Sequence, residues 1–162
     1  MPVIEVVTEI AAPPGLVFDL ARSIDFHVET QARHAERVVA GRTTGLIELG
    51  ESVTWEAVHF GVRQRLTSKI TVFARPDHFR DEMTHGVFAY FVHDHHFHSV
   101  AAGTRMVDVL DYAAPLGPLG RIAERVAVTR HLRRLLTDRA QLVRDVAQGW
   151  DDDAAAKFSI SG

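Results

Sequence analysis

Hydrophobic and polar residues alternate along most of the chain between residues 32 and 113, and a period of two residues is typical of β-strands. The segment 2–10 alternates in the same way, with Ile4 and Ile10 on one side and Glu5 and Glu9 on the other. Gly, Pro and Asp separate the alternating segments, and 41–50 is a longer, turn-rich connection. The pattern predicts seven strands, at residues 2–10, 32–40, 52–60, 62–74, 78–85, 87–100 and 104–113. Short connections between successive strands predict an antiparallel meander.

Three other segments have the spacing of helices. Pro14 suits the first turn of a short helix that continues to Ala21, and Ser23 is a candidate cap for a second short helix through Val28. A third, long helix is predicted at residues 118–148, about 45 Å in length at 1.5 Å per residue. Its apolar stripe comprises Leu119, Ile122, Val126, Leu132, Leu135 or Leu136, Leu142 and Val146, and the solvated side carries charged residues that include Arg133, Arg134 and Arg139. A helix with one long apolar stripe needs a long partner surface, which the predicted sheet would supply.

Composition narrows the class of protein. The chain has 162 residues, a net charge of −3 and no cysteine, which excludes disulfides and thiolate metal sites and argues against nucleic acid as the main partner. No apolar run is long enough to span a bilayer, and the first residues do not resemble a signal peptide, so we expect a soluble, cytoplasmic protein without membrane insertion. We expect one α+β domain at residues 1–148. Residues 149–162 carry an acidic cluster and are expected to form a flexible tail, with Trp150 folded back on the domain.

Several short motifs, in this order of elements, resemble one family. They are Gly45-Leu46-Ile47, Val53-Thr54-Trp55, His59-Phe60-Gly61, Asp81-Glu82-Met83, Gly86-Val87-Phe88, His93-Asp94-His95-His96-Phe97 and the Pro-Leu-Gly-Pro-Leu-Gly junction at 115–120. Together they are similar to the ligand-binding branch of the SRPBCC superfamily, the START or Bet v 1-like helix-grip proteins, whose bacterial members include polyketide cyclase/dehydrase relatives. The resemblance covers roughly residues 3–147. It implies a curved antiparallel sheet of about seven strands around the long C-terminal helix, two short helices after the first strand, and an internal cavity.

A sheet that grips a helix buries one face, so one parity of each strand is expected to point into the cavity. The aromatic and apolar members of the predicted inward set include Trp55, Val72, Phe79, Met83, Ala89, Phe91, Met106 and Tyr112, and the polar members are His59, Gln64, Asp81, His93, His95 and Asp108. The opposite parity, including Thr54, Glu56, Arg63, Arg65, His96 and His98, is expected in solvent. Buried polar groups are costly without partners, so the inward set must pair internally or with a ligand.

The inward histidines and aspartates leave several kinds of chemistry open. His93 and His95 with Asp108 are candidate catalytic residues, the carboxylate orienting an imidazole that acts as acid or base. Alternatively, the group recognises polar atoms of a ligand or is purely structural. A His-x-His pair could also ligate a metal, but the spacing fixes no third ligand, so no metal and no cofactor are predicted. Candidate ligand contacts are Trp55, His59, Gln64, Phe79, Asp81, Met83, Phe91, Met106 and Tyr112, with Asp25 and His27 as rim contacts.

Three functions follow. The first is binding of a small lipophilic molecule, such as a polyketide, quinone or lipid, in the cavity. The second is a cyclase/dehydratase-type enzyme without metal that uses a His/Asp acid–base pair. The third is an interaction module whose cavity is filled by its own aromatic side chains. The fold does not choose between binding and catalysis. We favour binding, because no nucleophile or cofactor motif is present, and the sequence does not distinguish a monomer from a homodimer.

Overall fold

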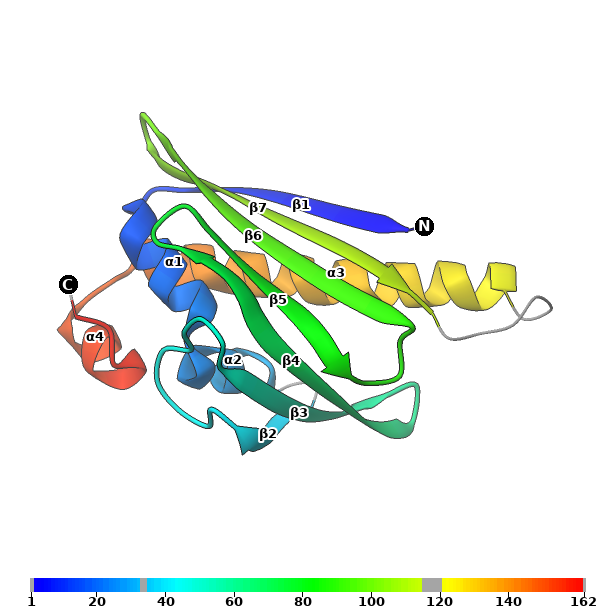
Figure 1. Cartoon of the computed structure of the whole chain (residues 1–162). Helices are drawn as coiled ribbons and strands as arrows, with labels where there is room; N and C mark the ends of the chain where they lie inside the picture. The colour runs from blue at the N-terminus through cyan, green and yellow to red at the C-terminus, as the bar shows by residue number, and fades with distance from the viewer. Residues whose placement is uncertain (1, 33–34, 115–120, 162) are drawn as a thin grey trace.

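A computed structural model describes residues 2–32, 35–114 and 121–161 of the chain, with the backbone alone for 121–124. Seven antiparallel strands form one sheet in the order β1-β7-β6-β5-β4-β3-β2 (Figure 1). They are β1 (Val3–Ile10), β2 (Arg37–Gly41), β3 (Ser52–His59), β4 (Val62–Ala74), β5 (His78–His85), β6 (Tyr90–Val100) and β7 (Gly103–Ala113). From β2 to β7 each strand pairs with the next one along the chain, whereas β1 joins the sheet beside β7. The predicted meander and strand count are confirmed.

Two strands start several residues later than predicted, whereas the other boundaries agree to within one residue. The strand expected at 32–40 starts at Arg37, because Ala35 has a left-handed φ of 53° and its N–H bonds to Ala32 O in a turn. The strand expected at 87–100 starts at Tyr90, because residues 86–89 form a series of bends. Both strands are therefore shorter than the alternation alone suggests.

The helices lie on the concave side of the sheet, and α3 crosses behind the strands in Figure 1. The two short helices are α1 (Pro14–Arg22) and α2 (Ile24–Thr30). Pro14 stands in the first turn of α1, and the Ser23 side chain accepts a hydrogen bond from Phe26 N as the cap of α2. Both predicted roles are confirmed.

The long helix α3 (Arg121–Gln148) buries a slightly different stripe from the one predicted. The residues most deeply buried are Leu136, Ala140, Val143 and Ala147, spaced at four, three and four. Val126, which we expected on the apolar side, is 61% exposed, because the inward face of this part of α3 is formed by its neighbours Ala127 and Val128. Leu119 and the predicted start of the helix at 118 lie outside the described residues.

The acidic C-terminal segment is not detached from the rest of the chain. Asp151 caps α4 (Asp152–Phe158) by accepting a hydrogen bond from Ala154 N, and Phe158 and Ile160 are buried in the main core. The Phe158 ring packs edge-on against Phe26 of α2. This arrangement differs from the flexible tail that we expected, since the acidic residues serve as a cap and first turn while the apolar ones anchor the helix. Trp150 packs against the same core, as expected.

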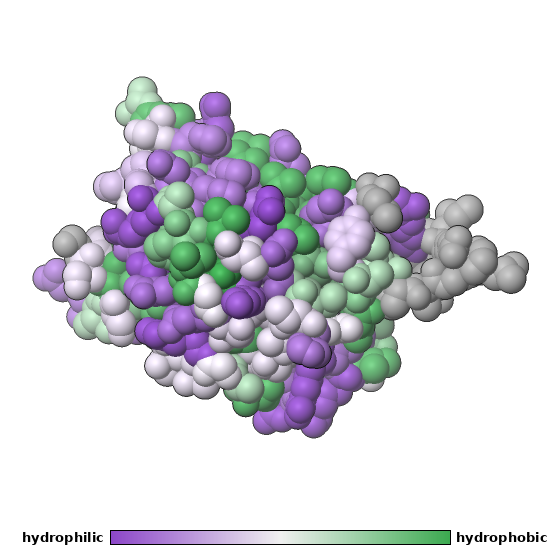
Figure 2. Space-filling model, viewed as in Figure 1, coloured by the Kyte–Doolittle hydropathy of each residue, from purple (hydrophilic) through white to green (hydrophobic). Residues whose placement is uncertain are grey.

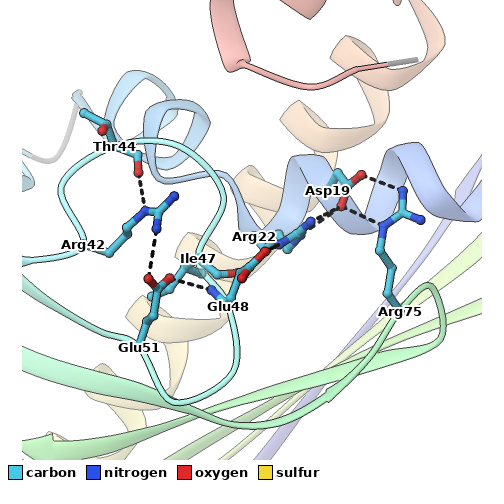
Figure 3. Close-up of polar contacts among 8 residues, drawn as sticks. All are labelled: Asp19, Arg22, Arg42, Thr44, Ile47, Glu48, Glu51 and Arg75. Carbon is cyan, nitrogen blue, oxygen red and sulfur yellow. Dashed lines mark hydrogen bonds and ion pairs between the residues drawn. The ribbon is translucent and has the colours of Figure 1, made fainter.

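A buried ion pair fixes α1 to the connection between β2 and β3 (Figure 3). Asp19 binds Arg22 within α1 and Arg75 at the end of β4. Arg22 also donates to Ile47 O, so the loop carrying Ile47 is held against the helix. The pKa of Asp19 is held below its usual value: burial opposes ionisation, but the two guanidinium groups outweigh it. The loop is thereby positioned as a wall of the interior.

Two side chains on the outer face differ from the predictions, Glu56 in its exposure and Val72 in its direction. Figure 2 views this face and shows hydrophilic side chains spread over it among smaller apolar patches. Glu56 was expected in solvent but is only 3% exposed, because Arg37 and Arg65 hydrogen-bond to it and cover it. Val72 was expected inside, but a β-bulge between Ile70 and Val72 reverses the parity. Phe73 consequently points into the core in its place.

No helix in the described ranges combines the length and apolar character needed to cross a membrane.

Candidate functional site

A partly open cavity of about 600 Å³ lies between the sheet and α3, a volume within the usual range of small-molecule sites. Its apolar wall comes from the loop after β2, from β3 to β7 and from α3, and includes Ile47, Val53, Trp55, Phe79, Phe91, Leu110, Leu132 and Leu136. Two polar groups interrupt this wall. The aromatic side chains among the described residues leave this space open, whereas the third alternative expected them to fill it.

The first polar group, here called the inner cluster, consists of Asp81, His93, His95 and Asp108 on the adjacent strands β5, β6 and β7. The strand register pairs Asp81 with His93 and His95 with Asp108. His95 Nε2 donates to Asp81 Oδ2 over 3.1 Å, and His95 Nδ1 lies 2.7 Å from Asp108 Oδ1. Both ring nitrogens of His95 therefore face a carboxylate.

His93 completes the inner cluster with weaker contacts. Its Nδ1 lies 3.8 Å from Asp81 Oδ2, and its Nε2 lies 3.3 Å from Asp108 Oδ1. Although that second distance is short, the angle does not suit a hydrogen bond, and His93 Nε2 is buried without a hydrogen-bond partner among the described residues. His93 is 5% exposed and His95 2%. In the inner cluster, both ring nitrogens of His95 thus lie beside a carboxylate, whereas His93 Nε2 lacks a hydrogen bond to the described residues.

Burial and hydrogen bonding act in opposite directions on the protonation of the inner cluster. Burial disfavours the charged form of His95, but hydrogen bonds to Asp108 and Asp81 outweigh it and raise its pKa. Burial and the neighbouring His95 lower the pKa of His93. Burial also opposes ionisation of Asp81 and Asp108, yet the histidines hold the pKa of each below its usual value. These directions favour the ionised forms of Asp81 and Asp108, protonation of His95 and the neutral form of His93.

The second polar group, here called the Glu36 cluster, lies where α2, the residues before β2, β3 and α3 meet. Glu36 accepts a hydrogen bond from His27 Nε2 over 3.0 Å and lies 3.9 Å from His59. His59 in turn bonds to His131 of α3 over 3.0 Å, and His27 stacks on Trp55. Burial lowers the pKa of His27, whereas the His27 hydrogen bond overcomes burial and lowers the pKa of Glu36.

Arg139 of α3 connects the two clusters electrostatically. Its positive charge lowers the pKa of Asp81 in the inner cluster and of both His27 and Glu36 in the other. The guanidinium lines the cavity and donates a hydrogen bond to Ala21 O. We had placed Arg139 on the solvated side of the helix. It lies inside because the face of α3 that meets the cavity is wider than the stripe of large apolar residues.

Most of the predicted site residues meet at the cavity. Trp55, His59, Gln64, Phe79, Asp81, Phe91, His93 and His95 all line it. Their roles toward a ligand remain predictions. Asp108 lies behind the two histidines, beside a second, much smaller pocket under α1 and α3.

Three predicted ligand contacts do not line the cavity. Met106 borders the small second pocket in the core. The Tyr112 hydroxyl shares a hydrogen bond with Thr129 while its ring packs edge-on against Phe88. Met83 is half-buried beside Gly86, at the end of β5. Asp25 accepts a hydrogen bond from Gly45 N, so it holds a loop, whereas His27 does line the cavity.

Other cavity residues were missed by sequence reasoning. Glu36 lies in the segment 32–40 that was predicted as a strand, but the strand begins only at Arg37, so the predicted alternation did not apply to it. His131 lies beside the expected apolar positions of the helix. Their shared signal is chemical: a lone carboxylate and a lone histidine in otherwise apolar or arginine-rich surroundings.

Neither a protein-family model nor a curated protein matches the chain. Solved structures do match. The protein TTHA0849 from Thermus thermophilus has 20% sequence identity and a TM-score of 0.65, with 88% of this chain and 97% of that chain covered. Zhui aromatase/cyclase from Streptomyces sp. R1128 has 13% identity and a TM-score of 0.69, with 91% and 93% covered. Ginseng major latex-like protein 151 from Panax ginseng has 11% identity and a TM-score of 0.62, with 90% and 97% covered.

These similarities span nearly the whole of each chain, and at such low identity they establish the fold rather than an activity. The antiparallel order of seven strands, the two short helices after β1 and the long C-terminal α3 agree with them. The chain has the Bet v 1-like helix-grip fold, which it shares with an aromatase/cyclase.

Proposed function

We propose that the protein binds a small lipophilic molecule bearing polar groups, of the polyketide, quinone or lipid type, in its cavity. One observation carries the proposal: a largely apolar space of about 600 Å³ with the inner cluster in its wall. An apolar wall binds a hydrocarbon or ring skeleton through burial, and a few fixed polar groups set its orientation. The structural similarity to an aromatase/cyclase and to a latex-like protein supports a binding fold.

The polar groups favour an oxygenated ring system over a plain acyl chain. Arg139 and Gln64 supply donors, whereas Glu36 and His93 supply acceptors from other strands and loops of the wall. A saturated chain would displace water from these groups without replacing its hydrogen bonds, at a cost of about 1–3 kcal/mol for each bond lost. Carbonyl or hydroxyl groups on the ligand would satisfy them.

The first experiment is native mass spectrometry of the purified protein, followed by denaturing extraction and identification of any small molecule that it carries. A panel of polyketides, quinones and fatty acids is then screened by thermal shift. We expect a stoichiometric lipophilic compound or a shift with an oxygenated ring compound. Absence of both would contradict the proposal.

A matched pair of variants locates the binding site. Ala57 points into the cavity, whereas its neighbour Val58 is 46% exposed on the outer face. Ala57→Phe should abolish binding by filling the space, and Val58→Phe should leave it unchanged. Equal affinity in the two variants would place the ligand elsewhere.

A second candidate function is acid–base catalysis of the cyclase/dehydratase kind, favoured by His93, a buried imidazole that lines the cavity and whose pKa is lowered by burial and by the neighbouring His95. In that function His93 would remove a proton next to a ligand carbonyl, and a donor in the wall would stabilise the resulting enolate oxygen. Incubation with a poly-β-ketone tests it by product analysis. His93→Gln should retain ligand binding and lose turnover, and undiminished turnover in that variant would exclude His93 as the base.

A further inference from the structure

The inner cluster has the donor arrangement of a metal site. Asp81, His93 and His95 each offer one ligand atom, and all three atoms lie within 4.8 Å of one another. Asp81 Oδ2 is 3.1 Å from His95 Nε2 and 3.8 Å from His93 Nδ1. Bonds of about 2.0–2.2 Å to one ion would place such atoms roughly 3.3 Å apart, so the existing spacing needs only a small movement of His93.

We propose that Asp81, His93 and His95 bind a divalent transition-metal ion, and that Asp108 orients both imidazoles from behind. The proposal goes beyond ligand binding and does not depend on it. The spacing of His93 and His95 along β6 gives two ligands, and the cross-strand register of Asp81 with His93 supplies the third that the sequence alone could not fix.

The position of Asp108 is the strongest geometric support. Its Oδ1 lies 2.7 Å from His95 Nδ1 and 3.3 Å from His93 Nε2, the ring nitrogens that face away from Asp81. Histidines that ligate metals donate their outer N–H to a carboxylate in this way, which fixes the tautomer and turns the other nitrogen toward the ion. A small rotation of His93 would also give its Nε2 a hydrogen bond to Asp108.

The charge balance agrees with a cation. Asp81 and Asp108 are two carboxylates in a buried setting, and in the described parts of the chain no arginine or lysine comes within ion-pair distance of either. A divalent ion would neutralise both by replacing the proton that His95 Nε2 shares with Asp81, and that proton is released to solvent on binding. Two imidazoles and one carboxylate suit Zn²⁺, Co²⁺ or Fe²⁺ better than Mg²⁺ or Ca²⁺, which prefer oxygen ligands. Because the three residues line the cavity, a bound ion would keep a coordination position open to it.

The outer face provides a matched control. His78, Asp94 and His96 also place their donor atoms close together. There, however, Arg80 donates to both oxygens of Asp94, over 2.8 and 2.9 Å, so that carboxylate is already neutralised. The outer group should bind metal weakly or not at all.

The test uses untagged protein that has been stripped with a chelator and titrated with Zn²⁺ by calorimetry and with Co²⁺ by visible absorption. We expect one ion per chain and the absorption of Co²⁺ in a low-coordinate nitrogen/oxygen site. Asp108→Asn should weaken binding about 10- to 100-fold, and His93→Gln or Asp81→Asn should weaken it further. His96→Gln should change nothing.

Circular dichroism of each variant without metal controls for folding, and Zn²⁺ should raise the melting temperature of the unaltered protein. The proposal is overturned if the unaltered protein shows no saturable site. It is equally overturned if His96→Gln abolishes binding while a folded His93→Gln or Asp81→Asn retains it.

Discussion

The two faces of the sheet each bury a carboxylate, but they neutralise it by different means. Inside, Asp108 is 5% exposed, and its ion-pair partners are His93 and His95. Outside, Glu56 is 3% exposed and is bound by Arg37 and Arg65, whose own side chains are largely in water. The outer carboxylate is covered by a thin layer of side chains, whereas the inner one lies within the protein.

This difference separates a structural ion pair from a site whose charge can change. Arginine stays protonated at all ordinary pH values, so Glu56 has a permanent counter-charge. Histidine can be neutral, protonated or metal-bound, so the inner cluster can adopt several charge states. The same sheet therefore holds a fixed network on one face and an adjustable one on the other.

The largest predicted effect is on the inside. Asp108→Asn removes the charge without changing the shape of the side chain and leaves the buried imidazolium of His95 with one carboxylate. We expect a loss of about 3 kcal/mol in the free energy of unfolding, the size typical of a broken buried pair. Urea denaturation measures it. The matched outer variant, Glu56→Gln, should lose clearly less, and equal losses would remove the distinction between the two faces.

A smaller effect concerns acid stability on the outside. Hydrogen bonds from Arg37 and Arg65 lower the pKa of Glu56 from 4.5 to about 2. Because the folded-state pKa is the lower one, its stabilisation is complete above pH 4.5 and disappears as the pH falls through about 2. The difference in unfolding free energy between the unaltered protein and Glu56→Gln should therefore shrink over that interval. A constant difference would show that the shift in pKa does not contribute.

The smallest predicted effect is on salt dependence. At about 1 M salt the screening length is about 3 Å, so partly solvated ion pairs weaken while buried ones change little. Added sodium chloride should reduce the cost of Glu56→Gln and leave that of Asp108→Asn nearly unchanged. Urea titrations of both variants at two salt concentrations test this, and equal sensitivity would argue that Asp108 is reached by solvent.

The alternation of hydrophobic and polar residues predicted most of the strands and many side-chain directions, because the face to which a strand residue points depends on its local sequence position. It gave the bounds of β4 and β5 and the inward direction of His93, His95 and Asp108. It failed at Val72, where a bulge adds one residue and reverses the faces. Strand parity gives the direction of a side chain but not its exposure. Glu56 points outward as predicted, but Arg37 of β2 and Arg65 of β4 shield it from solvent.

The remaining parts of the site depend on contacts between distant segments. Glu36 reaches the cavity from a segment that was predicted as a strand but is irregular up to Arg37, so the predicted alternation did not apply to it. The neighbours of Arg139 one helical turn away, Leu135, Leu136, Leu142 and Val143, are apolar, and only its charge placed it on the solvated side. The acidic C-terminal segment was misjudged for a related reason, since the burial of Phe158 depends on its contact with Phe26, far away in sequence. Local patterns predicted the helices and strands, but long-range packing determined that Glu36 and Arg139 line the cavity.

The two edge strands of the sheet differ in how well they resist aggregation. β2 has only five residues, its pairing with β3 is irregular between Val38 and Ala40, and it carries Arg37, all features that discourage a foreign strand from pairing with it. β1 is eight residues long and pairs with β7 in unbroken register from Val3 to Ile10. Its other side offers a regular ladder of backbone donors and acceptors. Under conditions that loosen the fold, β1 is the edge at which intermolecular strand pairing should begin.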